Sequence, residues 1–419
     1  MPQRERPSRG AGWLAAWLIV LAAAVLTPLP VQDAEALAQP RTLLPMGWLA
    51  DGIRNLILFA PLGAALWSTG RTRRSALAIG FGLSLVIEIL QLAIPGRFPA
   101  LSDLVFNTLG TGLGVGLASF WPDLSRPSAR RARALSLSAA AASISVLLAA
   151  AWLLQPAFPT TPYFGGWTPD LGHLEQYTGQ VLEARVGPNP IPPAGPAPDT
   201  EALRTALADG EPLLIRAVTG APPSALAPLV TIHDDQQREI LLLGLEGDDL
   251  LIRQLLRAFT FGLENPALRA RGVLSGLSPH SPFSVEVVSA GPQRLVRVTS
   301  VGNPIVRLAW TPGGSWTLFA TNPLRGDSQS WIFDLVWGAL LVLPAAYWAR
   351  GSIICWLGVG AIPLLAAALP LLGAISAFPL REWIAMLAGA AAGAYCSRCA
   401  RGGSQSRSGS GGTTRPRAH

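Results

Sequence analysis

The sequence predicts an α-helical polytopic membrane protein of about eight transmembrane helices, with an extracytoplasmic all-β domain inserted between the fifth and sixth. Composition is the first reason. Half of the 419 residues are hydrophobic and 14% are charged, whereas a soluble domain carries about 25% charged residues. The second reason is that apolar runs near bilayer-spanning length recur along the chain and are interrupted by one long segment of short β-prone runs.

Eight apolar runs are candidate spans: 12–30, 48–67, 75–94, 101–121, 136–154, 331–349, 353–374 and 380–397. The first resembles a signal peptide, because Arg4, Arg6 and Arg9 precede it and 34–38 resembles a cleavage region. Its apolar stretch is longer than a usual signal core, which favours a retained helix. We expect a four-helix membrane module over 1–125, a fifth helix over 134–155, a β domain over 156–328, three helices over 329–398 and a disordered cytoplasmic tail over 399–419.

Arginine placement predicts the orientation. Arg residues cluster in alternate connections, namely those before the first helix, at 71–74, at 126–133 and after 397, and Arg350 follows the sixth helix. The short loops between them carry one Arg each, at Arg41, Arg97 and Arg381. By the positive-inside rule, both termini are cytoplasmic and residues 156–328 lie outside a bacterial cytoplasmic (inner) membrane.

The net charge of +7 does not indicate nucleic-acid binding. Residues 160–330 hold 12 Arg and 16 Asp or Glu, a net of −4, so the positive charge belongs to the membrane part. No basic stripe with interleaved aromatic residues is present, and we expect no nucleic-acid partner. Cys396 and Cys399 form a C-x-x-C pair without a second pair or a nearby His, so no metal is expected.

The inserted segment alternates β-prone runs with Gly, Pro and Asp punctuation. We predict strands at 212–218, 227–233, 238–245, 250–256, 283–288, 294–299, 305–309 and 316–320. Their spacing is typical of a sandwich or jelly roll. A short helix is predicted at 199–209, where Asp199 can cap the first turn. The Pro- and Gly-rich segment 163–199 is expected to lead into the fold.

Polar residues within three consecutive spans form a pattern, because ionisable groups inside a membrane are costly and usually face protein or a water-filled cavity. The residues are Asp51, Arg54 and Asn55, then Ser84, Glu88 and Gln91, then Asp103 and Asn107. Offsets of three and four place each set on one helix face. In the predicted orientation each set lies within about 10–12 Å of the external interface.

The three polar faces are therefore expected to converge on a shallow outward-facing site, beside Arg97 in the loop that joins the third and fourth spans. The alternative is that these residues only join the helices by hydrogen bonds. For Gly110, Gly112, Gly114 and Gly116 we favour close helix packing, since the small-xxx-small pattern lets helices approach.

These residues resemble the VanZ-like family, named after a teicoplanin-resistance protein. The resemblance is carried over about 45–120 by three ordered motifs: Asp51, Asn55, Phe59, Pro61 and Gly63; Ser84, Glu88 and Gln91; and Arg97, Asp103, Asn107, Gly110 and Gly114. It implies a small multi-helix membrane module of the bacterial cell envelope, with a link to glycopeptide resistance. The family's biochemical activity is poorly defined, so the resemblance indicates a place more than a mechanism.

The segment 229–253 reads as strand, polar turn, strand, Gly-Asp turn and strand, and the insert (about 160–325) is similar to a concanavalin A-like, LamG-type jelly roll. Such folds often bind glycans, sometimes through calcium. Asp234, Asp235, Asp248 and Asp249 could supply oxygen ligands, although turn residues are the simpler interpretation. Paired glutamates for glycoside hydrolysis are not visible, so a binding or structural domain is favoured.

The leading hypothesis is that the polar site recognises an envelope ligand, such as a lipid-linked glycan precursor, a glycopeptide or cell-wall glycan, and that the β domain binds glycan or protein. The chain would contact membrane lipid and need no cofactor.

The alternative is a membrane-embedded enzyme acting on a lipid-linked substrate, with Glu88 and Asp103 as acid and base and Arg54 and Arg97 holding phosphate. No nucleophile with its base is visible, so no catalytic residue is assigned. A transporter is disfavoured, because the acids lie on one side of the membrane and no inverted repeat is apparent.

Overall fold

The computed structural model describes residues 7–27, 47–94, 99–172, 174–290, 293–299, 305–320, 330–372, 375–376 and 379–408. Its long helices are α1 (Pro7–Leu26), α2 (Trp48–Ser68), α3 (Arg73–Gln91), α4 (Leu101–Ser125), α5 (Ala129–Leu153), α8 (Ser330–Ala349), α9 (Ile353–Ala368, continued by the 3-10 turn η3 at Leu369–Leu372) and α10 (Leu380–Ser408). These are the eight helices predicted from the hydropathy of the sequence.

Within the described residues, six helices are long and apolar enough to cross a membrane, namely α2, α3, α4, α5, α8 and α9 with η3. The described apolar part of α1, Gly10–Leu26, is shorter, and α10 is not among the six. Helix α10 continues to Ser408, so residues 399–408 are helical where an unstructured tail was predicted. The chain is a helical membrane protein into which a β domain is inserted.

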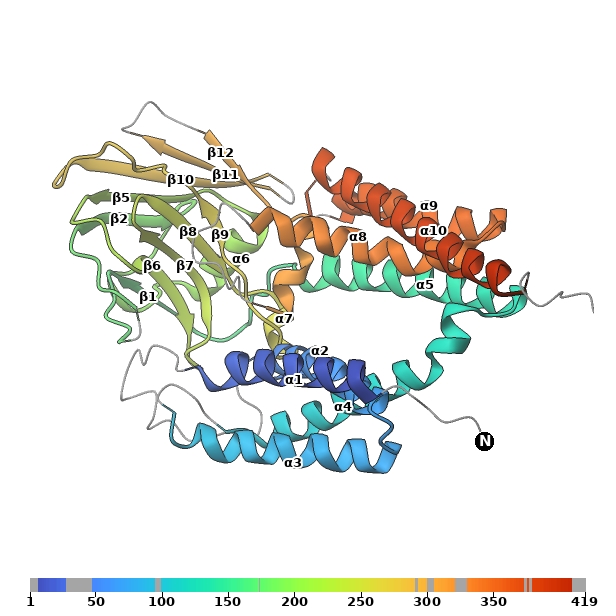
Figure 1. The fold of residues 1–419 in the computed structure, drawn as a ribbon. Coiled ribbons are helices and arrows are strands. Elements are labelled where there is room, and N and C mark those ends of the chain that lie inside the picture. The colour runs from blue at the N-terminus through green and yellow to red at the C-terminus, as the bar shows by residue number, and fades with distance from the viewer. Residues whose placement is uncertain are drawn as a thin grey trace, which may run out of the picture.

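The helices form two groups, and the β domain lies at the same end of both (Figure 1). In the first group α4 packs along α2 and against α3, and α1 packs on α2. In the second group α5 packs against α8 and α9, and α8 packs along α10. At the end remote from the β domain, the α4–α5 connection accepts hydrogen bonds from Tyr347 Oη, Trp348 Nε1 and Arg350 Nη1 near the end of α8, at 2.7–2.9 Å.

Glycines allow the close approach of α2 and α4. A Cβ at Gly114 would lie 1.7 Å from the carbonyl oxygen of Ala60, and one at Gly63 would lie 2.0 Å from that of Thr111. Only a residue without a side chain fits such a backbone contact. The packing interpretation of the α4 glycines therefore holds for Gly114 and for Gly110, whose Cβ would meet Leu56 O at 2.5 Å, but nothing lies within 4 Å of a Cβ at Gly116.

The β domain is a sandwich of two six-stranded antiparallel sheets. The first has the order β4-β1-β6-β7-β8-β9 and the second the order β12-β11-β10-β5-β2-β3. The strands are β1 (Tyr163–Trp167), β2 (Gln180–Val186), β3 (Asn189–Pro190), β4 (Ala194–Pro196), β5 (Leu213–Val218), β6 (Ala227–Asp234), β7 (Glu239–Glu246), β8 (Asp249–Gln254), β9 (Leu268–Ala270), β10 (Pro282–Ala290), β11 (Gln293–Thr299) and β12 (Ile305–Leu308).

Seven of the eight predicted β runs are strands, and the eighth is wrong. Residues 313–318 form a 3-10 helix, η1 (Gly313–Leu318), because the Oγ of Ser315 and the Oγ1 of Thr317 bond to carbonyls three residues back. The predicted short helix is α6 (Thr200–Asp209), and the Asp199 carboxylate caps it by accepting a 2.9 Å bond from the Ala202 N–H. The segment expected only to lead into the fold contributes β1 to β4.

The β domain also contacts the first helical group, to which it is not directly linked in the chain. After β8, the chain forms the short helix α7 (Arg257–Thr260) and a loop that reaches the start of α2. There the Gly262 carbonyl accepts bonds from the amides of Leu49 and Ala50, at 2.9 and 3.0 Å. The ring of Phe261 meets Trp152 of α5 edge-on at 5.5 Å, so this loop contacts both helical groups.

Candidate functional site

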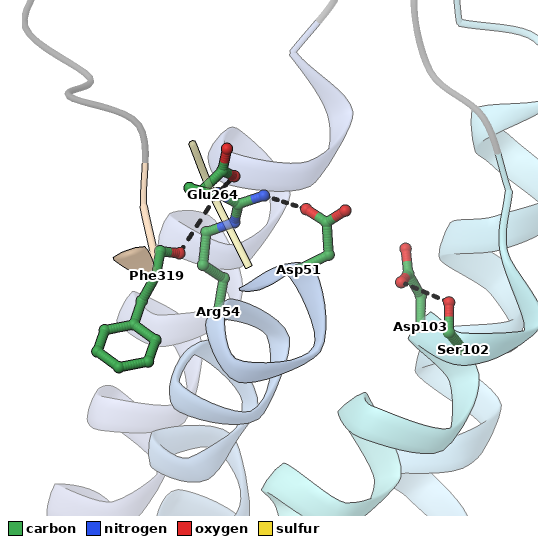
Figure 2. A network of polar contacts seen from close by, with 6 residues as sticks. All are labelled: Asp51, Arg54, Ser102, Asp103, Glu264 and Phe319. Carbon is green, nitrogen blue, oxygen red and sulfur yellow. Dashed lines mark hydrogen bonds and ion pairs between the residues drawn. The ribbon is translucent and has the colours of Figure 1, made fainter. Parts of the chain in front are cut away.

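Arg54 of α2 is the centre of a polar network at the end of the helix nearest the β domain (Figure 2). Its guanidinium pairs with Asp51 one turn earlier in α2. It also binds Glu264 of the β domain, with 2.7 Å between Nη1 and Oε1, and donates a 3.4 Å bond to the Phe319 carbonyl. Two carboxylates and a carbonyl therefore occupy this guanidinium.

Glu88 and Asp103 bring two more carboxyl groups to the same end of the bundle. Glu88 Oε2 accepts a 2.9 Å bond from the amide of Ala100, which stands immediately before α4. A carboxylate at this place is stabilised by the unpaired amides and the dipole of the helix N-terminus. Asp103, in the first turn of α4, interacts electrostatically with Glu88 and with Asp51.

Asn55 extends the α2 side of this group. Its side chain lies within hydrogen-bonding reach of the Asp103 carboxylate, and the hydroxyl of Ser102 approaches the same carboxylate at 3.5 Å. Asp51, Asn55 and Asp103 are partly exposed, whereas Glu88 is 9% exposed. The end of the site nearest the β domain is thus half-open, and there Arg54 pairs with Asp51 while Glu88 and Asp103 interact as two like charges.

One turn farther into the bundle, polar side chains form a buried seam between α3 and α4. Asn107 Nδ2 donates a 2.9 Å bond to Ser84 Oγ, and both residues are buried. Asn107 Oδ1 is buried as well, and no described residue donates a hydrogen bond to it. Gln91 leaves the seam and donates a 3.1 Å bond to the Val25 carbonyl of α1.

The structure brings together most of the residues singled out in the sequence, in two environments. Asp51, Arg54, Asn55, Glu88 and Asp103 surround the half-open end, while Ser84 and Asn107 form the interhelical seam. Arg97 lies outside the described residues. The seam agrees with the interpretation that these residues join the helices, and the half-open end is the place at which a site is predicted.

Two contributors were missed by the sequence interpretation. Glu264 and Phe319 are 210 and 265 residues from Arg54 in the chain and belong to the insert and its exit. Periodicity and spacing give no indication of such contacts. The fold of the loop after α7 brings Glu264 to Arg54.

Residues 14–122, which run from within α1 to within α4, match the family model described as VanZ/LLP1. This segment of the membrane protein is VanZ-like. No curated protein and no solved structure gives a significant match. The matched segment begins earlier than the resemblance found in the sequence and includes α1, to which Gln91 is bonded.

Outside the VanZ-like segment, aspartates of the β domain accept hydrogen bonds in turns. Asp234 accepts bonds from the amides of Gln236 and Arg238 and from the Arg238 guanidinium at 2.7–3.0 Å. Although burial opposes ionisation, these donors hold the pKa of the Asp234 carboxyl below its usual value. Asp249 is bonded by Arg269 and by the amide of Gly272. The residues that the structure describes contain no group of three or more His, Cys, Asp or Glu suited to a metal ion.

A second polar cluster joins η1, which follows the last strand of the β domain, to α8 and α10. Asp334 accepts a 2.9 Å bond from Trp316 Nε1, so it belongs here and not to the VanZ-like site. The fully buried Glu382 accepts a 2.6 Å bond from the amide of Gly313. Trp310 and Trp316 are both at most 9% exposed, which makes them core aromatics and not a sugar-stacking surface.

Proposed function

We propose that this VanZ-like protein recognises a polar ligand of the bacterial cell envelope at the half-open ends of α2, α3 and α4. The candidate ligands are a lipid-linked glycan precursor, a glycopeptide or cell-wall glycan. The observation that carries the proposal is the convergence of Asp51, Asn55, Glu88 and Asp103 from three helices on one half-open place. Glu88 of α3 and Asp103 of α4 are interacting carboxyls, and two like charges do not hold helices together.

The same proposal places both termini in the cytoplasm and the β domain outside the cytoplasmic membrane. The Arg-rich connections after α2 and α4, and Arg350 after α8, support this orientation, because they lie at the ends of the helices remote from the β domain. A reporter that is active only in the cytoplasm, fused near Gly220, should be inactive. Activity of that fusion would reverse the orientation and place the site on the cytoplasmic side.

The β domain is proposed to bind glycan or a partner protein above the membrane, as its similarity to concanavalin A-like domains implies. A hollow between the β7–β8 turn and the segment after β5 supports this role. It is lined by Tyr177, Leu245, Leu274, Leu277 and by prolines that include Pro222 and Pro223. In this lining Pro222 and Pro279 are exposed, and they offer apolar ring surface to a sugar or a peptide.

The test of the main proposal uses the full chain in lipid nanodiscs. Binding of a labelled lipid-linked glycan precursor and of a glycopeptide would be titrated for the wild type, Asp103→Asn and Asp123→Asn. Asp123 is an exposed acid of the same helix at the opposite end, so its variant controls for the loss of one charge. We expect weaker binding for Asp103→Asn alone. Equal binding by all three proteins would contradict the site.

A membrane-embedded enzyme is the second candidate, and the closeness of Glu88 and Asp103 favours it. Two interacting carboxyls can divide the roles of general acid and general base. Glu88→Gln would then abolish turnover of a lipid-linked substrate while leaving its binding in place. If Glu88→Gln weakened binding and no substrate was consumed by the wild type, the recognition role would stand and the enzyme would not.

A further inference from the structure

We propose that the VanZ-like site takes a ligand group with a positive charge, a protonated amine, rather than a phosphate or carboxylate. This inference rests on the proposed ligand-binding function and names the chemical class of the group that is bound. Three features of the site support it: the excess of carboxyl groups, the ion pairs that already occupy the Arg54 guanidinium, and the unpaired side-chain oxygen of Asn107.

The described residues at the site hold four carboxyl groups, on Asp51, Glu88, Asp103 and Glu264, and one guanidinium, on Arg54. Outside the described residues, the outer loops next to α2, α3 and α4 contribute Arg41 and Arg97. Even if both lay at the site, the formal charge of the ionised groups would stay negative. A partly buried cluster with excess negative charge repels an anion and attracts a cation.

Arg54 is not available to hold a phosphate. One Nη pairs with Asp51, and the other bonds to Glu264 at 2.7 Å and to the Phe319 carbonyl at 3.4 Å. An anionic ligand would have to displace two carboxylates that already neutralise this guanidinium. Recognition of phosphate or carboxylate by Arg needs a free, fork-shaped pair of N–H groups.

Asn107 is an independent indication of a ligand that donates hydrogen bonds. Its side chain is 3% exposed, its Nδ2 is committed to Ser84, and its Oδ1 has no partner. A buried acceptor without a donor costs about 1–3 kcal/mol, so such an atom calls for a functional explanation. Asn107 is four residues after Asp103 in α4 and lies one helical turn deeper on the same face.

The described groups still available at the site are acceptors: the carboxyls of Glu88 and Asp103 and the amide oxygen of Asn107. A protonated primary amine has three donors and no acceptor, which complements this set in charge and in hydrogen bonding. An N-acetylated amine offers one donor and no charge, and it lacks that complementarity. The amine could belong to a zwitterionic lipid headgroup or to a deacetylated cell-wall glycan.

The test uses the full chain in nanodiscs of phosphatidylglycerol, a bilayer without amines. The lipid arm compares dihexanoyl-phosphatidylethanolamine with its N-acetyl derivative, and the glycan arm compares chitosan tetrasaccharide with its N-acetylated form. Dihexanoyl-phosphatidylglycerol is the anionic probe. We expect the amine form in at least one arm to bind about tenfold more tightly than its acetylated match, and that arm identifies the source of the amine.

Glu88→Gln and Asp103→Asn should each weaken binding of the amine probe about tenfold, as loss of a charge-assisted bond does, while Asp123→Asn leaves it unchanged. Melting temperatures of the variants show that each is folded, and the two site variants provide independent readings. Preference for the anionic or acetylated probes, with binding still sensitive to these variants, would overturn the amine but keep the ligand-binding function. Absence of binding to every probe would overturn both.

Discussion

Replacing Gly114 of α4 by alanine should separate α2 from α4 and destabilise the VanZ-like module. The new Cβ would lie 1.7 Å from the Ala60 carbonyl oxygen, whereas such contacts are essentially never below 3.0 Å. The helices must therefore move apart by roughly 1.3 Å at this point, or the helix must distort. The atoms in the way belong to backbone, so no side-chain rotation relieves the overlap. Forcing one extra carbon into a packed interface costs about 1–3 kcal/mol.

Gly116→Ala is the matched control, because nothing lies within 4 Å of its Cβ. There the helix-forming preference of alanine over glycine should stabilise the protein by up to about 1 kcal/mol. Because both variants gain the same helix preference, they should differ in stability by about 1–3 kcal/mol, the cost of the overlap at residue 114. The assay is thermal melting of the full chain in detergent, followed by the loss of the monodisperse peak in size-exclusion chromatography. Gly110→Ala, whose Cβ meets Leu56 O at 2.5 Å, should fall between them. Equal melting of Gly114→Ala and Gly116→Ala would refute the close contact of α2 and α4.

The other predictions concern ionisable groups that the fold holds in defined partnerships. Arg238 and the turn amides lower the pKa of Asp234, so the ionised carboxylate stabilises the folded protein at pH values above the ordinary carboxyl pKa near 4. This stabilisation is lost as pH falls through the lowered pKa of the folded state. Melting temperatures measured between pH 3 and pH 7 should fall at the acid end, and Asp234→Asn should reduce that fall. Glu264→Gln should lower the stability of the full chain by about 1 kcal/mol, since the ion pair to Arg54 is only partly buried, and its effect should vanish when Arg54 is already Gln, as a double-mutant cycle would measure. Glu382→Ala should cost about 1–3 kcal/mol because it leaves the buried amide of Gly313 without an acceptor, whereas Glu382→Gln keeps an acceptor and should melt closer to the wild type.

The helices were predictable because hydropathy acts over about twenty residues and requires no knowledge of tertiary contacts. The strands from β5 to β12 were mostly predictable because turn residues separate short β-branched runs. Strand β1 was missed because its sequence, Tyr-Phe-Gly-Gly-Trp, contains two glycines, which usually weaken a strand. In the fold Gly165 lies under the next layer of chain, where a Cβ would be 2.6 Å from the Pro192 carbonyl oxygen. Tertiary packing, and not local preference, makes this segment a strand.

At the site, the sequence predicted which residues lie on each helix face but not which partners they take. Spacing places Glu88 and Gln91 on one face, yet Glu88 bonds to the amide of Ala100 and Gln91 to the carbonyl of Val25. Backbone groups are present at every residue and carry no sequence signal. Whether a polar residue lies at the half-open end or in the buried seam depends on its depth in the bundle. That depth is determined by how the helices pack.

Arg54 joins the two parts of the protein that the chain itself keeps apart. The β domain is connected in sequence to α5 and α8, which belong to the second helical group, but its loop after α7 bonds to the start of α2 in the first group. Glu264 on that loop shares Arg54 with Asp51, and Asp51 interacts with Asp103. If a ligand on the β domain draws this loop away, Glu264 leaves Arg54, which then neutralises Asp51 more fully, and the site loses one negative charge. Under the proposed function, occupancy of the β domain would therefore weaken cation binding at the VanZ-like site, and by thermodynamic linkage a bound cation would act back on the β domain with the same free energy.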